Sequence, residues 1–173
     1  MKYFFTSDEH YYHRNIIKYC GRSFKDVEEM NETIIERHNK KVGEKDTVIH
    51  AGDFCLYNND IFEIHRLIDK LNGNHVFLRG SHDNWLCDNN QTRWEKTISG
   101  IHIVVDHYPL MTWPKSHYGS FDLHGHLHGY PPPIALGKQY DIGVDNNNFE
   151  PLSFDEIVEI MKSLPDNHNL IKK

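Results

Sequence analysis

A histidine-rich segment, His124-Gly125-His126-Leu127-His128-Gly129, has the residue types and spacing of a metal-binding loop. Histidine is the side chain most often used to bind catalytic transition metals, and glycine allows the backbone bends that aim two imidazoles at one place. An isolated pair of histidines is more often an ordinary surface feature. Here the rest of the chain favours a site, because it repeatedly places Asp and His directly after short apolar runs.

Five segments share one layout, in which an apolar run is followed by a sharp turn and then by Asp or His. They are Asp8-Glu9-His10, Gly52-Asp53, Gly80-Ser81-His82-Asp83, Asp106-His107 and Gly125-His126-Leu127-His128. In open α/β sheets, ligands bind beyond the carboxyl ends of the strands. Buried Asp and His are costly without partners, so sheet formation alone does not explain five such segments. Mixed carboxylate and imidazole ligands suit zinc, manganese or iron better than calcium or magnesium.

The apolar runs before these segments predict the strands that position them. Strands are expected at residues 2–6, 46–50, 74–78, 101–105, 121–123 and 140–144. Asp8 and His10 are two residues apart, so in extended backbone their side chains point to one side, as paired ligands must. The polar, Asn-rich stretch 85–94 is predicted to be a surface loop.

Helix signals lie between the first strands and near the end of the chain. They are the capping boxes Asp26–Glu29 and Ser153–Glu156 and a cap at Asn58 or Asn59. The order strand–helix–strand–helix–strand predicts an α/β fold that begins with a parallel sheet. The later strands lack intervening helices, so we expect antiparallel or mixed pairing there. The 173 residues contain no internal repeat and predict a single domain, 1–173.

The formal net charge of −6 limits the partners of this chain. Long nucleic acid is usually held by a basic stripe that neutralises many phosphates, and the sequence supplies none, so no such partner is expected. A small phosphorylated substrate is compatible with an acidic chain, because bound metal ions reverse the sign of the local field.

The three cysteines show no C-x-x-C spacing and predict reduced thiols instead of a disulfide frame. The chain shows neither a signal-peptide pattern nor an apolar run long enough to span a membrane. We therefore expect a cytoplasmic protein without a membrane partner.

Taken in order, the five segments read D-x-H, G-D, G-x-H-D, a single H and G-H-x-H. This ordered set resembles the signature of the calcineurin-like metallophosphoesterases, and the resemblance covers the chain from Tyr3 to Gly129. The tail 141–153 is similar to small, capless bacterial and phage members. The resemblance implies two mixed β-sheets packed face to face and flanked by helices. It also implies a metal-dependent phosphoesterase that cleaves phosphomonoesters or phosphodiesters, nucleotide-like ones above all, with a metal-bridging hydroxide.

The resemblance also assigns roles to individual residues. Asp8, His10 and His128 match the ligands of one metal, His107 and His126 those of the other, Asp53 the bridging carboxylate, His82 the general acid, and Asp83 the neighbour that orients His82. Two divalent ions are implied, with manganese favoured over iron, zinc or nickel. Asn15 and Arg22 match residues that line the phosphate pocket, and His13 does so less clearly.

One position departs from the pattern. Family members have Asn before the catalytic histidine, where its amide oxygen binds the second metal, and this chain has Ser81. A serine hydroxyl is also neutral, but it is shorter and a poorer ligand. The alternative function is therefore a binding module whose catalysis is weakened or lost through an impaired second metal site. The presence of His82 and of the other ligand types favours the enzyme.

Other histidines and aromatics receive ordinary structural expectations. His50 is expected to be packed and hydrogen-bonded within a strand, whereas His38, His65 and His75 are expected at the surface. Trp113 and Tyr130 adjoin two of the ligand segments and could stack on a base, although ordinary packing is the commoner role of an aromatic.

Overall fold

Two four-stranded sheets form the centre of the computed structural model, which describes residues 1–171 apart from 57–59, 88–89, 132–133 and 135. The first sheet has the order β3-β2-β1-β8, with β1 (Tyr3–Thr6), β2 (Thr47–His50), β3 (Asn74–Phe77) and β8 (Leu152–Ser153). The second has the order β4-β5-β6-β7, with β4 (Arg93–Ile98), β5 (Ile101–Asp106), β6 (Phe121–His124) and β7 (Gln139–Asp141).

Both sheets are mixed. Strands β1, β2 and β3 run parallel, and β8 pairs antiparallel with β1. Strands β5, β6 and β7 run parallel, and β4 pairs antiparallel with β5. The predicted parallel start and the mixed later strands are confirmed, as is the α/β fold with two mixed sheets.

The inner faces of the two sheets share one apolar core. Phe5 and Ile49 of the first sheet and Val105 and Leu123 of the second belong to the same buried cluster. Because side chains alternate along a strand, the neighbouring Val48 points to the other face of the first sheet. The strands of the first sheet are therefore apolar on both faces: one face packs against the second sheet, and the other contributes to a separate buried cluster.

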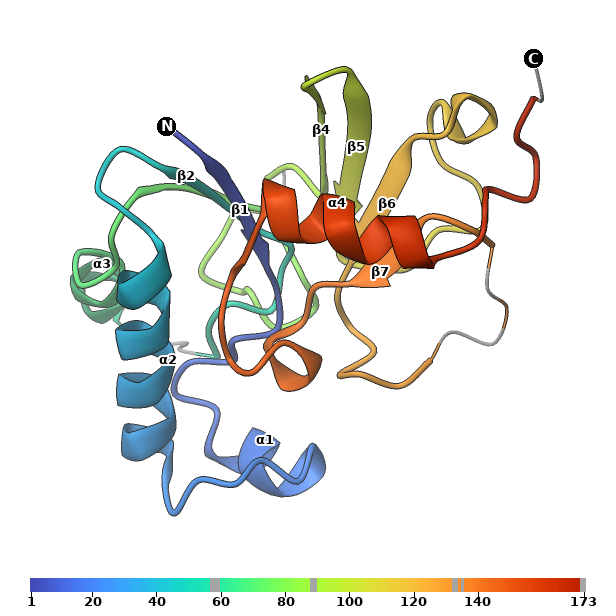
Figure 1. The fold of residues 1–173 in the computed structure, drawn as a ribbon. Coiled ribbons are helices and arrows are strands. Elements are labelled where there is room, and N and C mark those ends of the chain that lie inside the picture. The colour runs from blue at the N-terminus through green and yellow to red at the C-terminus, as the bar shows by residue number, and fades with distance from the viewer. Residues whose placement is uncertain (57–59, 88–89, 132–133, 135, 172–173) are drawn as a thin grey trace.

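Helices cover the outside of the sheets. They are α1 (Arg14–Tyr19), α2 (Val27–Lys41), α3 (Ile61–Ile68) and α4 (Phe154–Ser163), with the 3-10 turns η1 (Ser116–Tyr118) and η2 (Val144–Asn146). Helices α2 and α3 lie together on the side of the first sheet that faces away from β4–β7 (Figure 1). Helix α4 buries Ile157 and Met161 in the shared core.

The helix caps follow the sequence signals with one correction. Ser153 and Glu156 form the complete predicted capping box of α4. Asp26 caps α2 by accepting the amide of Glu29 at 2.8 Å. Helix α3 is capped by Asp60, whose carboxylate accepts the amide of Phe62 at 2.8 Å, and the predicted caps Asn58 and Asn59 lie outside the described residues.

Strand β4 is the element that the sequence pattern missed. The stretch 85–94 was expected to be a loop, but β4 starts at Arg93 and pairs along its whole length with β5. Its side chains are exposed or half-buried, so the strand lacks the apolar alternation that reveals a half-buried strand. The predicted strand 140–144 is shorter, because the chain turns after Asp141 into η2.

The structural expectations for four histidines can be checked directly. His50 is fully buried and contacts Glu9 Oε1 at 2.6 Å and His75 Nδ1 at 3.0 Å, as expected for a packed histidine. The expected surface position of His38 is wrong, because its ring is 3% exposed and lies 2.9 Å from the carbonyl of Asn72. His65 is exposed on α3, and His75 is half-buried.

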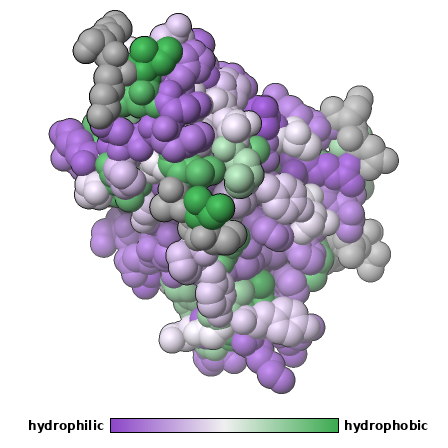
Figure 2. Space-filling model, turned by 90° about the vertical axis from the view of Figure 1, so that its right-hand side faces the viewer, coloured by the Kyte–Doolittle hydropathy of each residue, from purple (hydrophilic) through white to green (hydrophobic). Residues whose placement is uncertain are grey.

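The surface is mainly hydrophilic on the face shown in Figure 2, where hydrophobic patches are small and separated. Within the part of the chain that the structure describes, no helix has the length and apolar character required to cross a membrane.

Candidate metal centre

The five predicted segments meet beyond the carboxyl ends of β1, β2, β3, β5 and β6. Backbone hydrogen bonds join them directly: the amide of Asp8 donates to the carbonyl of Gly52 at 3.1 Å, and that of His10 to the carbonyl of Asp53 at 3.0 Å. The amide of Gly125 donates to the carbonyl of His107, also at 3.1 Å. Segments that are far apart in the sequence are therefore joined by backbone hydrogen bonds at one site.

Two groups of potential metal ligands lie at this site. Asp8, His10 and His128 form one group, and Asp53, His107 and His126 form the other, with the ligand atoms of each group within 4.8 Å of one another. Oδ2 of Asp53 lies 3.7 Å from Nε2 of His10 and 3.5 Å from Nε2 of His107. One carboxylate oxygen thus lies between the two groups, where a bridging ligand would be placed. The structure brings together all six residues that the sequence assigned to metal binding.

Both ligand groups contain buried polar atoms that lack a hydrogen-bond partner. Oδ1 of Asp8, Nε2 of His10 and Nε2 of His107 are buried and have no hydrogen-bond partner among the described residues. Each such atom costs about 1–3 kcal/mol when it is left unpaired. All three belong to the two ligand groups, so cations bound there would satisfy them.

Hydrogen bonds to Nδ1 of His107 and His128 determine which ring nitrogen can bind a metal. Nδ1 of His107 lies 2.9 Å from the carbonyl of Ala51, and a carbonyl can only accept, so Nδ1 carries the proton. Nδ1 of His128 likewise lies 2.8 Å from Oδ2 of Asp145. In both rings the neutral form therefore keeps its lone pair on Nε2. Such partners orient metal-bound histidines and raise their basicity.

The pKa values of the acidic and basic side chains in the centre depend on burial and on the neighbouring charges. Burial alone would raise the pKa of Asp53, but the facing imidazole of His107 holds it well below its usual range. Burial lowers the pKa of His107, yet Asp53 and Asp8 outweigh this and raise it to about 9. Burial raises the pKa of Asp8 to about 7, against the opposing effects of His107 and His128. A cation bound at these groups would compete with their protons, so its affinity would depend on pH.

The ligands occupy unusual backbone conformations. Positive φ angles occur at Asp8 (58°), His10 (52°), Asp53 (55°), His126 (69°) and His128 (49°). The expectation that Asp8 and His10 share a side of extended backbone is therefore wrong, since both are left-handed. Such residues cost of order 1–3 kcal/mol each and persist where the surroundings fix them, as at functional sites.

Two glycines allow the ligand loops to approach one another. A Cβ atom at Gly80 would clash with Oδ1 and the backbone nitrogen of Asp53. A Cβ atom at Gly125 would clash with Oγ of Ser7 and Oδ2 of Asp8. The absence of a side chain at both positions therefore brings the carboxylates into the centre.

His82 lies at the open side of the centre. Its side chain is 42% exposed, and its Nε2 lies 4.0 Å from Oδ2 of Asp53. Its backbone amide donates to Oδ1 of Asp53 at 2.8 Å, and its ring centroid lies 5.2 Å from that of His10. The imidazole can therefore reach both the ligand groups and solvent.

Asp83 has a different role from the one expected. Its carboxylate accepts hydrogen bonds from the amides of Asp53 (2.7 Å), Phe54 (2.9 Å), Cys55 (3.3 Å) and Gly80 (2.9 Å) and from Nε1 of Trp85 (3.1 Å). Among the described contacts, none joins Asp83 to the imidazole of His82. Asp83 therefore fixes the loop that carries Asp53, and the expectation that it orients His82 is corrected.

Ser81 points its hydroxyl at the carboxylate of Asp53. Oγ lies 3.2 Å from Oδ2 and 3.4 Å from Oδ1 of Asp53, so it donates a weak hydrogen bond there. The hydroxyl is therefore engaged with Asp53, and it offers the second group only a short hydroxyl oxygen, which is a poorer metal ligand than an amide oxygen.

The substitution Ser81→Asn is therefore expected to tighten manganese binding at the second group by about 10-fold or more, the scale on which changes around a metal act. An amide is longer and offers a carbonyl oxygen. Calorimetric titration with Mn²⁺ would measure the two affinities, and Ser81→Ala is the matched control, since it adds no oxygen. Equal occupancy in the serine and asparagine forms across the titration would reject the idea.

The three residues expected in the phosphate pocket occupy different places. The Arg22 side chain is 0% exposed, and it donates to both carboxylate oxygens of Asp145 (2.7 and 2.8 Å) and to the carbonyls of Asp8 (2.8 Å) and Glu9 (3.0 Å). Arg22 therefore stabilises the loop that carries Asp8. Its side chain is buried and fully engaged in these bonds, so the expected contact with substrate is wrong. Asn15 is exposed and lines a separate hollow on α1 with Lys18.

His13, the weaker candidate, lies inside the centre. Its Nδ1 is 3.1 Å from Nδ1 of His10, and its ring centroid is 5.5 Å from that of His82. The side chain is 8% exposed. Burial, followed by the neighbouring charge of His82, lowers its pKa. His13 thus supports His10 and borders the same opening as His82.

Asp145 is a functional residue that motif reasoning missed, although it lies in the tail noted for its resemblance to small family members. Its carboxylate joins the His128 imidazole to the Arg22 guanidinium, and Arg22 in turn holds the loop of Asp8. Burial raises the pKa of Asp145, but His128 and Arg22 outweigh this and lower it overall. The carboxylate of Asp145 thus connects His128 with the loop of Asp8, two parts of the first ligand group.

The substitution Asp145→Asn is expected to weaken binding of the first metal by about 10- to 100-fold, because partners of metal-bound histidines act on this scale. Isothermal titration with Mn²⁺ would measure the change. Asp69→Asn, at the exposed end of α3, is the matched control. Unchanged affinity with an unchanged melting temperature would show that Asp145 does not prepare His128 for the metal.

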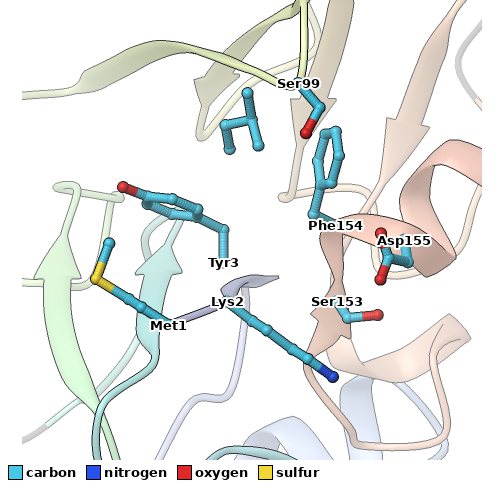
Figure 3. A pocket seen from close by; sticks show the side chains of 8 residues that line it. Met1, Lys2, Tyr3, Ser99, Ser153, Phe154 and Asp155 are labelled. Carbon is cyan, nitrogen blue, oxygen red and sulfur yellow. The ribbon is translucent and has the colours of Figure 1, made fainter.

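A further hollow of about 220 Å³ lies elsewhere, beside the amino end of β1 (Figure 3). Its wall includes Lys2, Tyr3, Ser99, Phe154 and Asp155. The ligand segments follow the carboxyl ends of the strands, so this hollow lies at the opposite end of β1 and is separate from the centre.

Comparison with known proteins gives the family. A family model described as calcineurin-like phosphoesterase matches residues 1–171. The uncharacterized protein MJ1445 of Methanocaldococcus jannaschii is 34% identical over 170 residues, which cover 93% of this chain and 92% of that protein. The crystal structure of AQ665 from Aquifex aeolicus, a protein of unknown function, superposes with a TM-score of 0.72 at 25% identity, over 92% of this chain and 98% of that one. The chain belongs to the calcineurin-like phosphoesterase family.

Proposed function

We propose that this protein is a phosphoesterase that uses two divalent metal ions, with manganese favoured, to hydrolyse small phosphoesters, nucleotide-like ones above all. The observation that carries the proposal is the position of Asp53 Oδ2, within 3.7 Å of His10 Nε2 and 3.5 Å of His107 Nε2. A buried carboxylate oxygen shared by two groups with unsatisfied ligand atoms suits a two-metal centre, and such centres are common in phosphoester cleavage.

Divalent cations at the two groups would act as Lewis acids on the phosphoryl oxygens and activate water for attack on phosphorus. The chain itself prepares the ligands. Asp8 and Asp53 offset the positive charge, and Ala51 and Asp145 hold the imidazoles of His107 and His128 in the required tautomer. This arrangement fixes the ligands before substrate arrives.

His82 supplies the proton of the reaction in this proposal. The leaving alkoxide of an ester needs a proton, and His82 is the half-exposed imidazole beside Asp53. General acid catalysis of this kind contributes about 10²–10⁴-fold. The hydrogen bond from its backbone amide to Asp53 keeps the ring near the two ligand groups.

Turnover of bis-p-nitrophenyl phosphate and p-nitrophenyl phosphate with added Mn²⁺ tests the proposal. The expected result is release of p-nitrophenolate from at least one compound, lost on chelation with EDTA and restored by metal. The alternative, a binding module with a weakened centre, draws support from the hydroxyl of Ser81 at the position of a ligand. Bound metal without turnover of either compound would favour that alternative.

The proposal also includes a small phosphorylated substrate as the partner and the cytoplasm as the location. A small phosphorylated substrate fits a chain whose formal net charge is −6, because cations at the centre supply the positive charge that the surface lacks. Long nucleic acid does not fit it, since that partner needs many basic contacts. The cytoplasm, with reduced Cys20, Cys55 and Cys87, is the proposed location.

A further inference from the structure

Tyr108 presents an aromatic ring at the edge of the metal centre. The residue is 46% exposed, and it directly follows the ligand His107. Its ring centroid lies 4.7 Å from that of His107 and 4.6 Å from that of His126, at interplanar angles of 75° and 63°. The ring thus contacts two ligands of the second group edge-to-face and still leaves nearly half of the residue open to solvent.

The backbone that carries this ring is held by a chain of hydrogen bonds. The amide of Tyr108 donates to Oδ1 of Asp106 at 3.2 Å. Oδ2 of Asp106 accepts from Nε and Nη2 of Arg93, both at 3.1 Å, and these two residues face each other across β4 and β5. The backbone that carries the ring is therefore held in place, which reduces the freedom lost when a ligand stacks on the ring.

Other aromatics are less suited to this position. Trp113, one of the two candidates from the sequence, is 4% exposed and donates its Nε1 hydrogen to the carbonyl of Ser120, so the structure makes it a packing residue. Tyr19 is exposed, but its ring centroid lies 6.2 Å from His13, which is not among the six ligands. Tyr130, the other candidate, is 71% exposed. Among the ring contacts of the described residues, none joins Tyr130 to a ligand, whereas Tyr108 contacts two ligands.

We propose that Tyr108 is a specificity residue that stacks on the nucleobase of a single nucleotide whose phosphate lies at the metal centre. This inference rests on the proposed function, since it needs a phosphate at that place. A planar base offers a face that an exposed tyrosine can contact, and stacking of this type changes affinity by roughly 5- to 150-fold per base. The net charge of −6 suits one nucleotide better than a long strand.

Binding of three non-hydrolysable phosphonates to the manganese-loaded protein tests this assignment by calorimetry. The probes are methylphosphonate, the abasic deoxyribose 5′-methylene phosphonate, and its thymidine counterpart. We expect the thymidine compound to bind at least several-fold more tightly than the abasic one. Tyr108→Ala should remove that difference between the thymidine and abasic compounds, each measured relative to methylphosphonate in the same variant, whereas Tyr108→Phe should retain it. Tyr118→Ala, a 70% exposed tyrosine on η1, is the matched control.

The outcomes separate this inference from the proposed function. Equal affinity for the thymidine and abasic compounds in the wild type, or an unchanged difference in Tyr108→Ala, overturns the role of Tyr108, even when p-nitrophenyl esters are cleaved. A base preference that disappears in Tyr108→Ala supports it, even when no ester is cleaved. In that last case the hydrolytic function fails and the centre is a nucleotide-binding site.

Discussion

Replacement of Asp53 by Asn is expected to leave a folded protein that binds one manganese ion at most and has lost phosphoesterase activity by about 10³-fold or more. Single electrostatic contributors to a transition state are worth about 10²–10³-fold, and Asp53 serves two metal ions at once. Its Oδ2 lies between His10 and His107, so no other described carboxylate is placed to replace it. The amide keeps the size of the side chain but removes the negative charge between the two groups.

Two measurements check this prediction together. Calorimetry or equilibrium dialysis with Mn²⁺ should show the stoichiometry falling from two to one or less, and p-nitrophenyl ester cleavage should fall in parallel. Asp155→Asn, on the exposed first turn of α4, controls for loss of a carboxylate. Two manganese ions bound with near-normal affinity in Asp53→Asn would contradict the bridging role, whatever the activity.

Most strand positions could be predicted because local signals encode them, and the ligand set followed from the resemblance of the five ordered segments to the family signature. Short apolar runs followed by Asp or His mark β1, β2, β3, β5 and β6, and parallel strands bring their carboxyl ends to one edge. That layout brings Asp8 and Asp53 together at the edge of the first sheet and His107 and His128 at the edge of the second, and the shared core places the two edges next to each other. Strand β4 lacked such a signal, since only Trp94 and Ile98 of its six residues pack against the core, which is too sparse for an alternating apolar pattern.

The supporting contacts could not be predicted, because they join residues far apart in the sequence. Arg22 and Asp145 are separated by 123 positions, and Asp53 and Asp83 by 30. The left-handed backbone at Asp8 follows from a similar cause, since its amide donates to Gly52 and its Oδ2 accepts the amide of His126. Such conformations are set by the partner loops, whereas the local sequence predicted an extended strand.

Replacement of His82 by Ala is expected to lower kcat by about 10²–10⁴-fold while both manganese ions remain bound. The reason is that His82 is absent from the two groups that contain the six predicted ligands, but its ring lies within 4.0 Å of Asp53 and is 42% exposed. A residue that only donates a proton to the leaving group should matter least when that group is a weak base. The loss should therefore be larger for an alkyl phosphoester than for a p-nitrophenyl ester of the same type.

The same experiment distinguishes a proton donor from a third metal ligand. His82 also forms a compact group with His10 and Asp53, so a ligand role is the specific rival explanation. If His82 binds metal, the alanine form should lose manganese affinity, and the losses for alkyl and p-nitrophenyl esters should be equal. His65→Ala, on the exposed side of α3, controls for removal of a surface imidazole. Retained metal stoichiometry together with a leaving-group-dependent loss is the pattern that a general acid alone produces, because only the acid acts on the departing oxygen.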